Sequence, residues 1–275
     1  MTASWPRPLP TVPFAPFVCS VAVAAAALPL AGCGEGDREG DPTETPALAS
    51  TPSPSPLPTA APRCEAEEVR CEDQLILDLG LVEGVTSAGA LTTTRDGATF
   101  LTEVDATAGG FGASADNPWI YLRFTQGGAE RVAVDDLDAL ESTDWHVAFK
   151  RYLIRLNSGT SGPSCVTASP VDGAFDDVAA VPSGASFAEE DFYDDGCALV
   201  ADDKGLGSAD VRLGAWWGYN GCVNTTGQVF LIQLPSGEVV KWEALSYYEE
   251  GQATCNAEGT PGKGSANFLT RWAFL

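Results

Sequence analysis

Histidine and methionine are nearly absent from the 275 residues: the chain has one of each, and the methionine is Met1. A Ser-His-Asp or Cys-His hydrolase needs an imidazole base beside its nucleophile. His146 is the sole candidate for that base, and no serine stands in a Gly-x-Ser-x-Gly segment. The sequence therefore favours a protein that is not an enzyme.

Basic residues are also scarce, with 15 Lys and Arg against 38 Asp and Glu and a formal net charge of −23. Such a field repels nucleic acid, so we expect no nucleic-acid partner. An acidic balance is also common in exported proteins, where it mainly indicates solubility.

Long apolar runs are absent after about residue 30. The earlier run, from about residue 14, contains Pro16 and Pro29, and it is marginal in length for a bilayer span of ~20 residues. It ends in Leu30-Ala31-Gly32-Cys33. An apolar segment, small residues and then a cysteine is the order of a lipoprotein signal peptide. We predict that residues 1–32 are this signal peptide and that Cys33 becomes the lipidated first residue. Loss of Arg7 with the signal would change the charge from −23 to −24.

The lipid would anchor the protein to a membrane, because each buried methylene contributes ~0.8 kcal/mol. Gly34 follows the cysteine, in place of the aspartate that retains lipoproteins at the inner membrane, which favours the outer membrane. Residues 33–63 are rich in Pro, Ser, Thr and Ala without an apolar period, and they predict an extended tether. The folded domain is then expected over residues 64–275.

The cysteines support export. Cys19 would leave with the signal and Cys33 would carry lipid. An even number then remains for an oxidising compartment, namely Cys64, Cys71, Cys165, Cys197, Cys222 and Cys255. We predict three disulfides and favour the most local pairing, Cys64–Cys71, Cys165–Cys197 and Cys222–Cys255. A zinc site is the alternative, although no Cys-x-x-Cys pair is present.

Short apolar stretches between glycine-rich and proline-rich loops predict a single, mainly β domain of antiparallel strands with long loops. The predicted single strands are 98–104, 119–124, 147–156 and 267–275. The clearest hairpin pairs 228–234 with 238–247. One short helix is expected within residues 65–81.

Three stretches in this order resemble the HmuY family of surface lipoproteins. The first runs from Trp145-His146-Val147-Ala148-Phe149-Lys150-Arg151-Tyr152 to Asn157-Ser158-Gly159. The second is Gly214-Ala215-Trp216-Trp217-Gly218-Tyr219, and the third is the hairpin of residues 229–242 that leads to Tyr247-Tyr248. The resemblance covers most of residues 98–275. It implies a HmuY-like β domain that captures haem, so haem is the one cofactor that we consider. The residues themselves indicate no metal site.

His146 and Tyr152 are the candidate ligand-binding residues. The haem-capturing member of the family is known for two histidines, and this chain has one. The resemblance places His146 where the family has aspartate and Lys150 where that member has a histidine. Iron ligation by His146 with a tyrosine or water, or by a tyrosine alone, stays open. In one extended strand, His146, Lys150 and Tyr152 would point to the same face. A purely structural role for His146 is the alternative.

The competing hypothesis is a structural or adhesion-type envelope module that binds an envelope protein and no small ligand. Calcium would stabilise such a module through loop carboxylates, and residues 189–195 and 202–203 are the richest acidic segments. Neither segment has the spacing of an Asp-x-Asp-x-Asp-Gly loop.

Overall fold

The computed structural model describes residues 64–275, which form a mainly β domain, as predicted. This part of the chain also contains two α-helices. The helices are α1 (Glu72–Leu79) and α2 (Gln252–Glu258). The strands are β1 (Leu91–Asp96), β2 (Thr99–Asp105), β3 (Ile120–Thr125), β4 (Gly128–Val132), β5 (Val147–Lys150), β6 (Leu153–Leu156), β7 (Thr167–Val171), β8 (Trp217–Tyr219), β9 (Val223–Thr225), β10 (Val229–Gln233), β11 (Val239–Glu250) and β12 (Lys263–Phe274). Neither helix in this part of the chain has the length and apolarity to cross a membrane.

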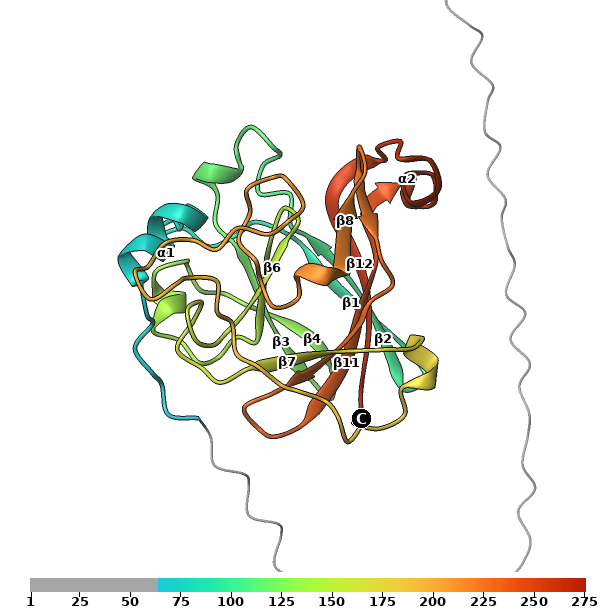
Figure 1. The fold of residues 1–275 in the computed structure, drawn as a ribbon, viewed down its shortest axis with the longest axis horizontal. Coiled ribbons are helices and arrows are strands. Elements are labelled where there is room, and N and C mark those ends of the chain that lie inside the picture. The colour runs from blue at the N-terminus through green and yellow to red at the C-terminus, as the bar shows by residue number, and fades with distance from the viewer. Residues whose placement is uncertain (1–63) are drawn as a thin grey trace, which may run out of the picture. The chain divides into compact units, whose positions relative to one another are not determined.

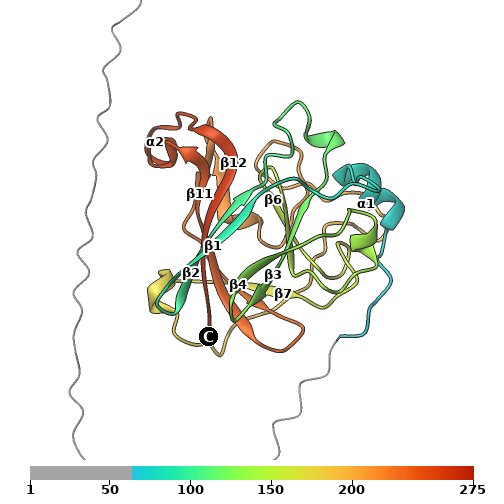
Figure 2. The same cartoon turned by 180° about the vertical axis from the view of Figure 1, so that it is seen from behind.

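The strands form two main antiparallel sheets and a small hairpin. The larger sheet has the order β1-β2-β12-β11-β10-β7, the smaller has the order β4-β3-β5-β6, and β8 pairs with β9. The edge strands β1 and β4 lie next to each other, where Thr93 Oγ1 donates to Ala129 O at 3.3 Å. Figures 1 and 2 show α1 beside the smaller sheet and α2 at the tip of β11 and β12.

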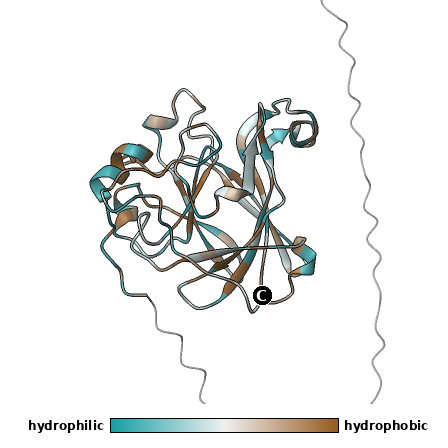
Figure 3. Cartoon of the chain, in the orientation of Figure 1, coloured by the Kyte–Doolittle hydropathy of each residue, from teal (hydrophilic) through white to brown (hydrophobic). Residues whose placement is uncertain are grey.

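The main core lies between the two sheets and is built largely from aromatic rings. Trp272 on β12 stacks on Phe100 of β2 at 4.3 Å between ring centroids and meets Phe124 of β3 at 4.9 Å. The alternation of a strand sends Ile120 and Leu122 into this core and Tyr121 to the opposite face. Figure 3 shows apolar residues concentrated on the central strands.

A second core covers the other face of the smaller sheet, where α1 packs. Leu75 and Leu79 of α1 are buried there with Trp119, Tyr121 and Trp145. The strands β3 and β5 are therefore apolar on both faces, which explains their continuous apolar sequence. The four tryptophans of the family-like stretches are all buried, namely Trp145, Trp216, Trp217 and Trp242.

Two predictions about secondary structure need correction. Residues 147–156 are not one strand: they form the β5–β6 hairpin, whose two-residue turn is Arg151-Tyr152. Both strands of this hairpin are largely buried, so its sequence is as continuously apolar as that of one buried strand. Helix α2 was not predicted, because it is only 7 residues long and has one buried side chain, Cys255. The helix expected within 65–81 is α1.

Three disulfides are present, as predicted, but only one of the expected pairs is right. Cys222 pairs with Cys255, at 6.0 Å between Cα atoms. The other pairs are Cys64–Cys165 and Cys71–Cys197, at 5.9 and 5.5 Å between Cα atoms. The predictions Cys64–Cys71 and Cys165–Cys197 are therefore wrong.

The segment before α1 explains the correction. It runs along two distant loops instead of folding back on itself. Glu67 N–H donates to Pro163 O at 2.9 Å, and Arg70 Nη2 donates to Tyr193 O at 3.2 Å. Each cysteine at the ends of this segment therefore meets a partner more than 100 residues away, with sequence separations of 101 and 126.

Candidate functional site

His146 is held inside the smaller sheet just before β5. Its Nδ1 accepts the Phe124 N–H at 3.0 Å, and its backbone N–H donates to Leu122 O at 2.8 Å. Burial lowers the pKa of His146 to about 4, with a smaller contribution from the Arg123 charge. The imidazole is thus neutral at pH 7, and one nitrogen serves as a hydrogen-bond acceptor for the neighbouring strand.

Tyr152 lies at the other end of β5, in the β5–β6 turn. Its ring packs on Trp217 at 4.9 Å between centroids. The four residues of β5 span about 13 Å at ~3.3 Å per residue, and Arg151 reverses the chain with a φ of 54°. The expectation that His146, Lys150 and Tyr152 share one face of a single strand is therefore wrong. Lys150 and Tyr152 come together, and His146 does not join them.

Lys150, Arg151 and Tyr152 line a groove of about 280 Å³ between the β5–β6 turn, the end of α1 and the loop before β3. Much of its wall is apolar, with Leu79, Trp119 and Leu153 among the lining residues. Two more apolar lining residues, Leu77 and Phe111, are exposed by 74% and 85%. A volume near 300 Å³ is at the lower end for a small-molecule site. A larger ligand would therefore be covered in part and would lie against Leu77 and Phe111.

The Lys150 ammonium forms part of the polar side of this groove. Lys150 is 6% exposed, and its Nζ donates to Gly80 O at 2.9 Å and to Leu79 O at 3.5 Å. These carbonyls end helix α1, where the partial negative charge of the helix favours a cation. Burial lowers the pKa of Lys150, while the Asp136 charge opposes the shift.

A buried network beneath the groove was missed by sequence reasoning. Arg155 is fully buried, and its guanidinium carbon lies 4.9 Å from the Trp119 ring centroid and 5.0 Å from that of Trp145. Arg155 Nη2 donates to Tyr121 Oη at 2.6 Å, and Tyr121 Oη donates to Asp136 Oδ1 at 2.9 Å. The sequence signal was a single arginine inside an apolar strand. The network fixes Trp119, which is part of the groove wall.

Asp136 closes this network by accepting hydrogen bonds from the backbone. Its Oδ1 accepts the Trp119 N–H at 2.9 Å, and its Oδ2 accepts the Val82 N–H at 3.0 Å. Burial raises the pKa of Asp136, and the hydrogen bond from Val82 opposes the shift. Two segments on either side of the groove are thereby tied to one carboxylate.

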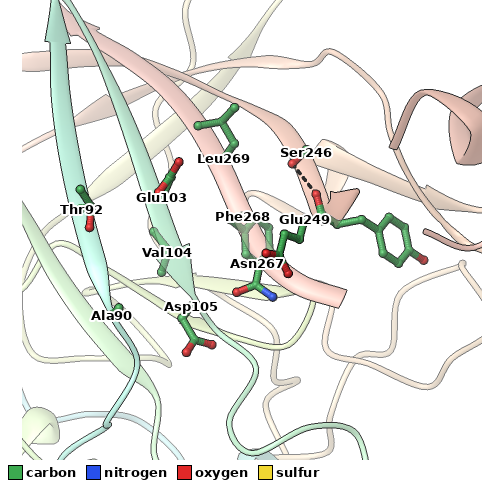
Figure 4. A pocket seen from close by; sticks show the side chains of 11 residues that line it. Ala90, Thr92, Glu103, Val104, Asp105, Ser246, Glu249, Asn267, Phe268 and Leu269 are labelled. Carbon is green, nitrogen blue, oxygen red and sulfur yellow. Dashed lines mark hydrogen bonds between the residues drawn. The ribbon is translucent and has the colours of Figure 1, made fainter. Parts of the chain in front are cut away.

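A second cavity, of about 310 Å³, lies on the larger sheet. Figure 4 shows the carboxylates of Glu103, Asp105 and Glu249 around it, with the Asn267 amide between them. No cluster of three metal-ligating side chains occurs here or elsewhere within residues 64–275. The cavity is acidic and is a poor site for an anionic ligand.

The acidic segments considered for calcium have other contacts. Asp191 forms an ion pair with Arg70 at 2.6 Å. Asp194 Oδ1 accepts two backbone N–H groups of its own turn, and Asp202 Oδ2 accepts the Ser208 hydroxyl. Glu190 is buried, and its carboxylate accepts the N–H groups of Leu156 and Arg212.

Several known proteins are similar to this chain. A family described as HmuY protein matches residues 115–259, which is more than half of the sequence. A candidate HmuY-like haem-binding protein of Bacteroides vulgatus has 15% identity and a TM-score of 0.43, over 66% of this chain and 96% of that one. An apo HmuY analogue of Tannerella forsythia has 15% identity and a TM-score of 0.40, over 69% of this chain and 97% of that one.

A candidate lipoprotein of Bacteroides fragilis has 12% identity and a TM-score of 0.41, over 70% of this chain and 97% of that one. Among curated proteins, none matches this chain. The match of the family over more than half of the sequence decides the assignment. The chain belongs to the HmuY family.

Proposed function

We propose that this protein is a lipid-anchored outer-membrane or surface lipoprotein that binds a tetrapyrrole such as haem and catalyses no reaction. The observation that carries the proposal is the groove, which combines apolar walls, Trp119, Tyr152 and the cation of Lys150. The HmuY family, whose resemblance implies haem capture, and the name of the Bacteroides vulgatus protein supply haem as the ligand to test first. The anchor at Cys33 and the tether of residues 33–63 lie outside the described residues and belong to the proposal.

The groove residues determine what kind of haem binding is proposed. Haem iron is held in proteins by His, Met, Cys or Tyr side chains, and among the groove residues Tyr152 is the one of these types. The ring of a tetrapyrrole is flat and apolar, so it suits a groove whose rim carries the exposed Leu77 and Phe111. We propose that Tyr152 is the iron ligand and that His146 keeps its role in the sheet.

Titration of hemin into the full-length protein, followed by the Soret band, tests the proposal. We expect saturable binding without the low-spin spectrum of a haem iron that is ligated by two histidines. Tyr152→Phe should shift the Soret band and weaken binding, whereas Tyr219→Phe, a change at a half-exposed tyrosine outside the groove, should leave both unchanged. His146→Gln should also leave the spectrum unchanged. Absence of saturable hemin binding, or a low-spin spectrum of a monomer that depends on His146, would contradict the proposed function.

A further inference from the structure

Lys150 is a buried cation without a carboxylate partner. Three donors are available on a lysine ammonium, and two of them face Gly80 O and Leu79 O. Within residues 64–275 no carboxylate oxygen lies within 4.0 Å of its Nζ, although ion pairs at that distance occur at five other basic residues. Burying a charge without an opposite charge is unfavourable. The carboxylates of Asp136 and Asp116 act on Lys150 from beyond ion-pair distance. The third donor is therefore free to meet an anion in the groove.

The other charged groups of the groove do not supply that anion. Asp78 is the carboxylate among the lining residues, and its two oxygens accept hydrogen bonds from Gln74 Nε2 at 2.9 Å and Tyr193 Oη at 3.0 Å. Arg151 adds a second cation at the groove, and its buried Nε has no hydrogen-bond partner. The groove is thus locally cationic on a chain whose net charge is −23.

The backbone at Arg151 is a separate observation. Arg151 has a φ of 54°, at a turn position where glycine is the favoured residue because it has no Cβ. Arg151 Nη2 donates to Ser265 Oγ at 3.1 Å and its backbone N–H donates to Ala106 O at 2.8 Å. An arginine in a strained conformation beside a groove is typical of a functional site.

We infer that the ligand of this groove carries a carboxylate and that Lys150 is the residue that recognises it. The inference rests on the proposed function and narrows the class of ligand to apolar, ring-shaped molecules that carry a carboxylate, such as a porphyrin with free propionates. Lys150 would donate its third N–H to a carboxylate oxygen while Trp119 and Leu79 contact the apolar part. A charge-assisted hydrogen bond of this kind is among the stronger polar contacts of a binding site.

Lys241 provides a matched control for Lys150. Its Nζ also donates to two backbone carbonyls, Phe175 O at 2.8 Å and Val178 O at 2.9 Å. Both ammonium groups lie over an aromatic ring: Lys150 Nζ is 6.0 Å from the Trp119 centroid, and Lys241 Nζ is 4.3 Å from the Phe175 centroid. Lys241 is on the larger sheet and does not line the groove. Lys150→Met and Lys241→Met therefore remove the same interactions at two places, and only the first place is the proposed site.

The experiment compares hemin with its dimethyl ester on the full-length wild type, Lys150→Met, Lys150→Arg and Lys241→Met. For the wild type we expect hemin to bind at least about tenfold more tightly than the ester, which corresponds to the loss of one charge-assisted hydrogen bond. Lys150→Met should remove this preference by weakening hemin alone. Lys150→Arg should restore part of it, and Lys241→Met should leave it unchanged. Thermal melting of each variant identifies a loss of folding.

The outcomes separate this inference from the proposed function. If hemin binds and the wild type does not distinguish it from the ester, the carboxylate site is wrong while haem binding stands. An equal loss of hemin and ester affinity in folded Lys150→Met would assign Lys150 to the iron or to the groove wall, and would also overturn the inference. If neither compound binds the wild type, both the proposed function and the inference fail.

Discussion

The buried chain of hydrogen bonds from Arg155 through Tyr121 to Asp136 predicts a large effect of a very small substitution. Tyr121→Phe removes one oxygen atom and keeps the ring, which is 1% exposed. Burial raises the pKa of Tyr121 above its ordinary value, so its hydroxyl stays protonated at neutral pH. The substitution therefore deletes one donor and one acceptor and changes the packing very little.

The expected loss follows from the two contacts. Tyr121 Oη accepts from Arg155 Nη2 at 2.6 Å and donates to Asp136 Oδ1 at 2.9 Å. A hydrogen bond to a charged group contributes roughly 1.5 to 3 kcal/mol. Arg155 retains its bond to Ser161 O at 2.6 Å, and Asp136 retains two backbone N–H donors. The two hydrogen bonds together would contribute roughly 3 to 6 kcal/mol. Because both charged groups keep other partners, we expect a loss of unfolding free energy at the low end of this range, about 3 kcal/mol.

Chemical unfolding without reductant measures this loss, and tryptophan fluorescence is a direct signal because Trp119 and Trp145 surround Arg155. A loss of about 3 kcal/mol corresponds to a decrease in melting temperature of roughly 6 to 12 °C for a domain of this size. Tyr219→Phe is the control, since this tyrosine is 49% exposed, and its stability should change by less than about 0.5 kcal/mol. A loss below about 1 kcal/mol in Tyr121→Phe would refute the claim that this network stabilises the fold.

Three further predictions follow from other parts of the chain. Cys33→Ser should release the protein from membranes or leave the precursor uncut, and persistent palmitate labelling of that variant would refute the lipidation site. Proteolysis without reductant should yield three cystine-linked peptide pairs in the connectivity of the structure, and recovery of a Cys64–Cys71 peptide would contradict it. His146 and Glu190 should affect the pH dependence of stability in opposite directions. Burial lowers the pKa of His146 from 6.5 to about 4, so its contribution to stability is present above pH 6.5 and is lost as the pH falls toward 4. Burial raises the pKa of Glu190 from 4.5 to about 7, so its contribution is present below pH 4.5 and is lost as the pH rises toward 7. As the pH rises from 4 to 7, the unfolding free energy of His146→Gln should fall relative to that of the wild type by on the order of 3 kcal/mol. That of Glu190→Gln should rise relative to the wild type by a similar amount. Stability profiles parallel to that of the wild type would refute the assignment.

Sequence reasoning was reliable where a property depends on neighbours along the chain. The strand of residues 119–124 was predicted within one residue of β3, and the hairpin of β10 and β11 was predicted from its Pro-Ser-Gly turn. Strand periodicity and turn chemistry are local properties of the sequence, so they can be recognised without knowledge of the fold. The same local view failed at residues 147–156. A strand and a tight hairpin have the same apolar content, and Arg151 is not a residue that signals a turn.

Composition alone excluded a bis-histidine site in one chain, and ordered motifs indicated the HmuY family. The tertiary structure decided which distant segments meet. It paired Cys64 with Cys165 across 101 residues, because the segment before α1 runs along a remote loop. It also separated His146 from Tyr152 at the two ends of β5 and placed Lys150 beside the carbonyls that end α1. Partners of this kind depend on topology, since contacts between segments a hundred residues apart leave no periodic signal in either segment. The candidate site therefore became visible only when the end of α1, the loop before β3 and the β5–β6 turn were brought together around one groove.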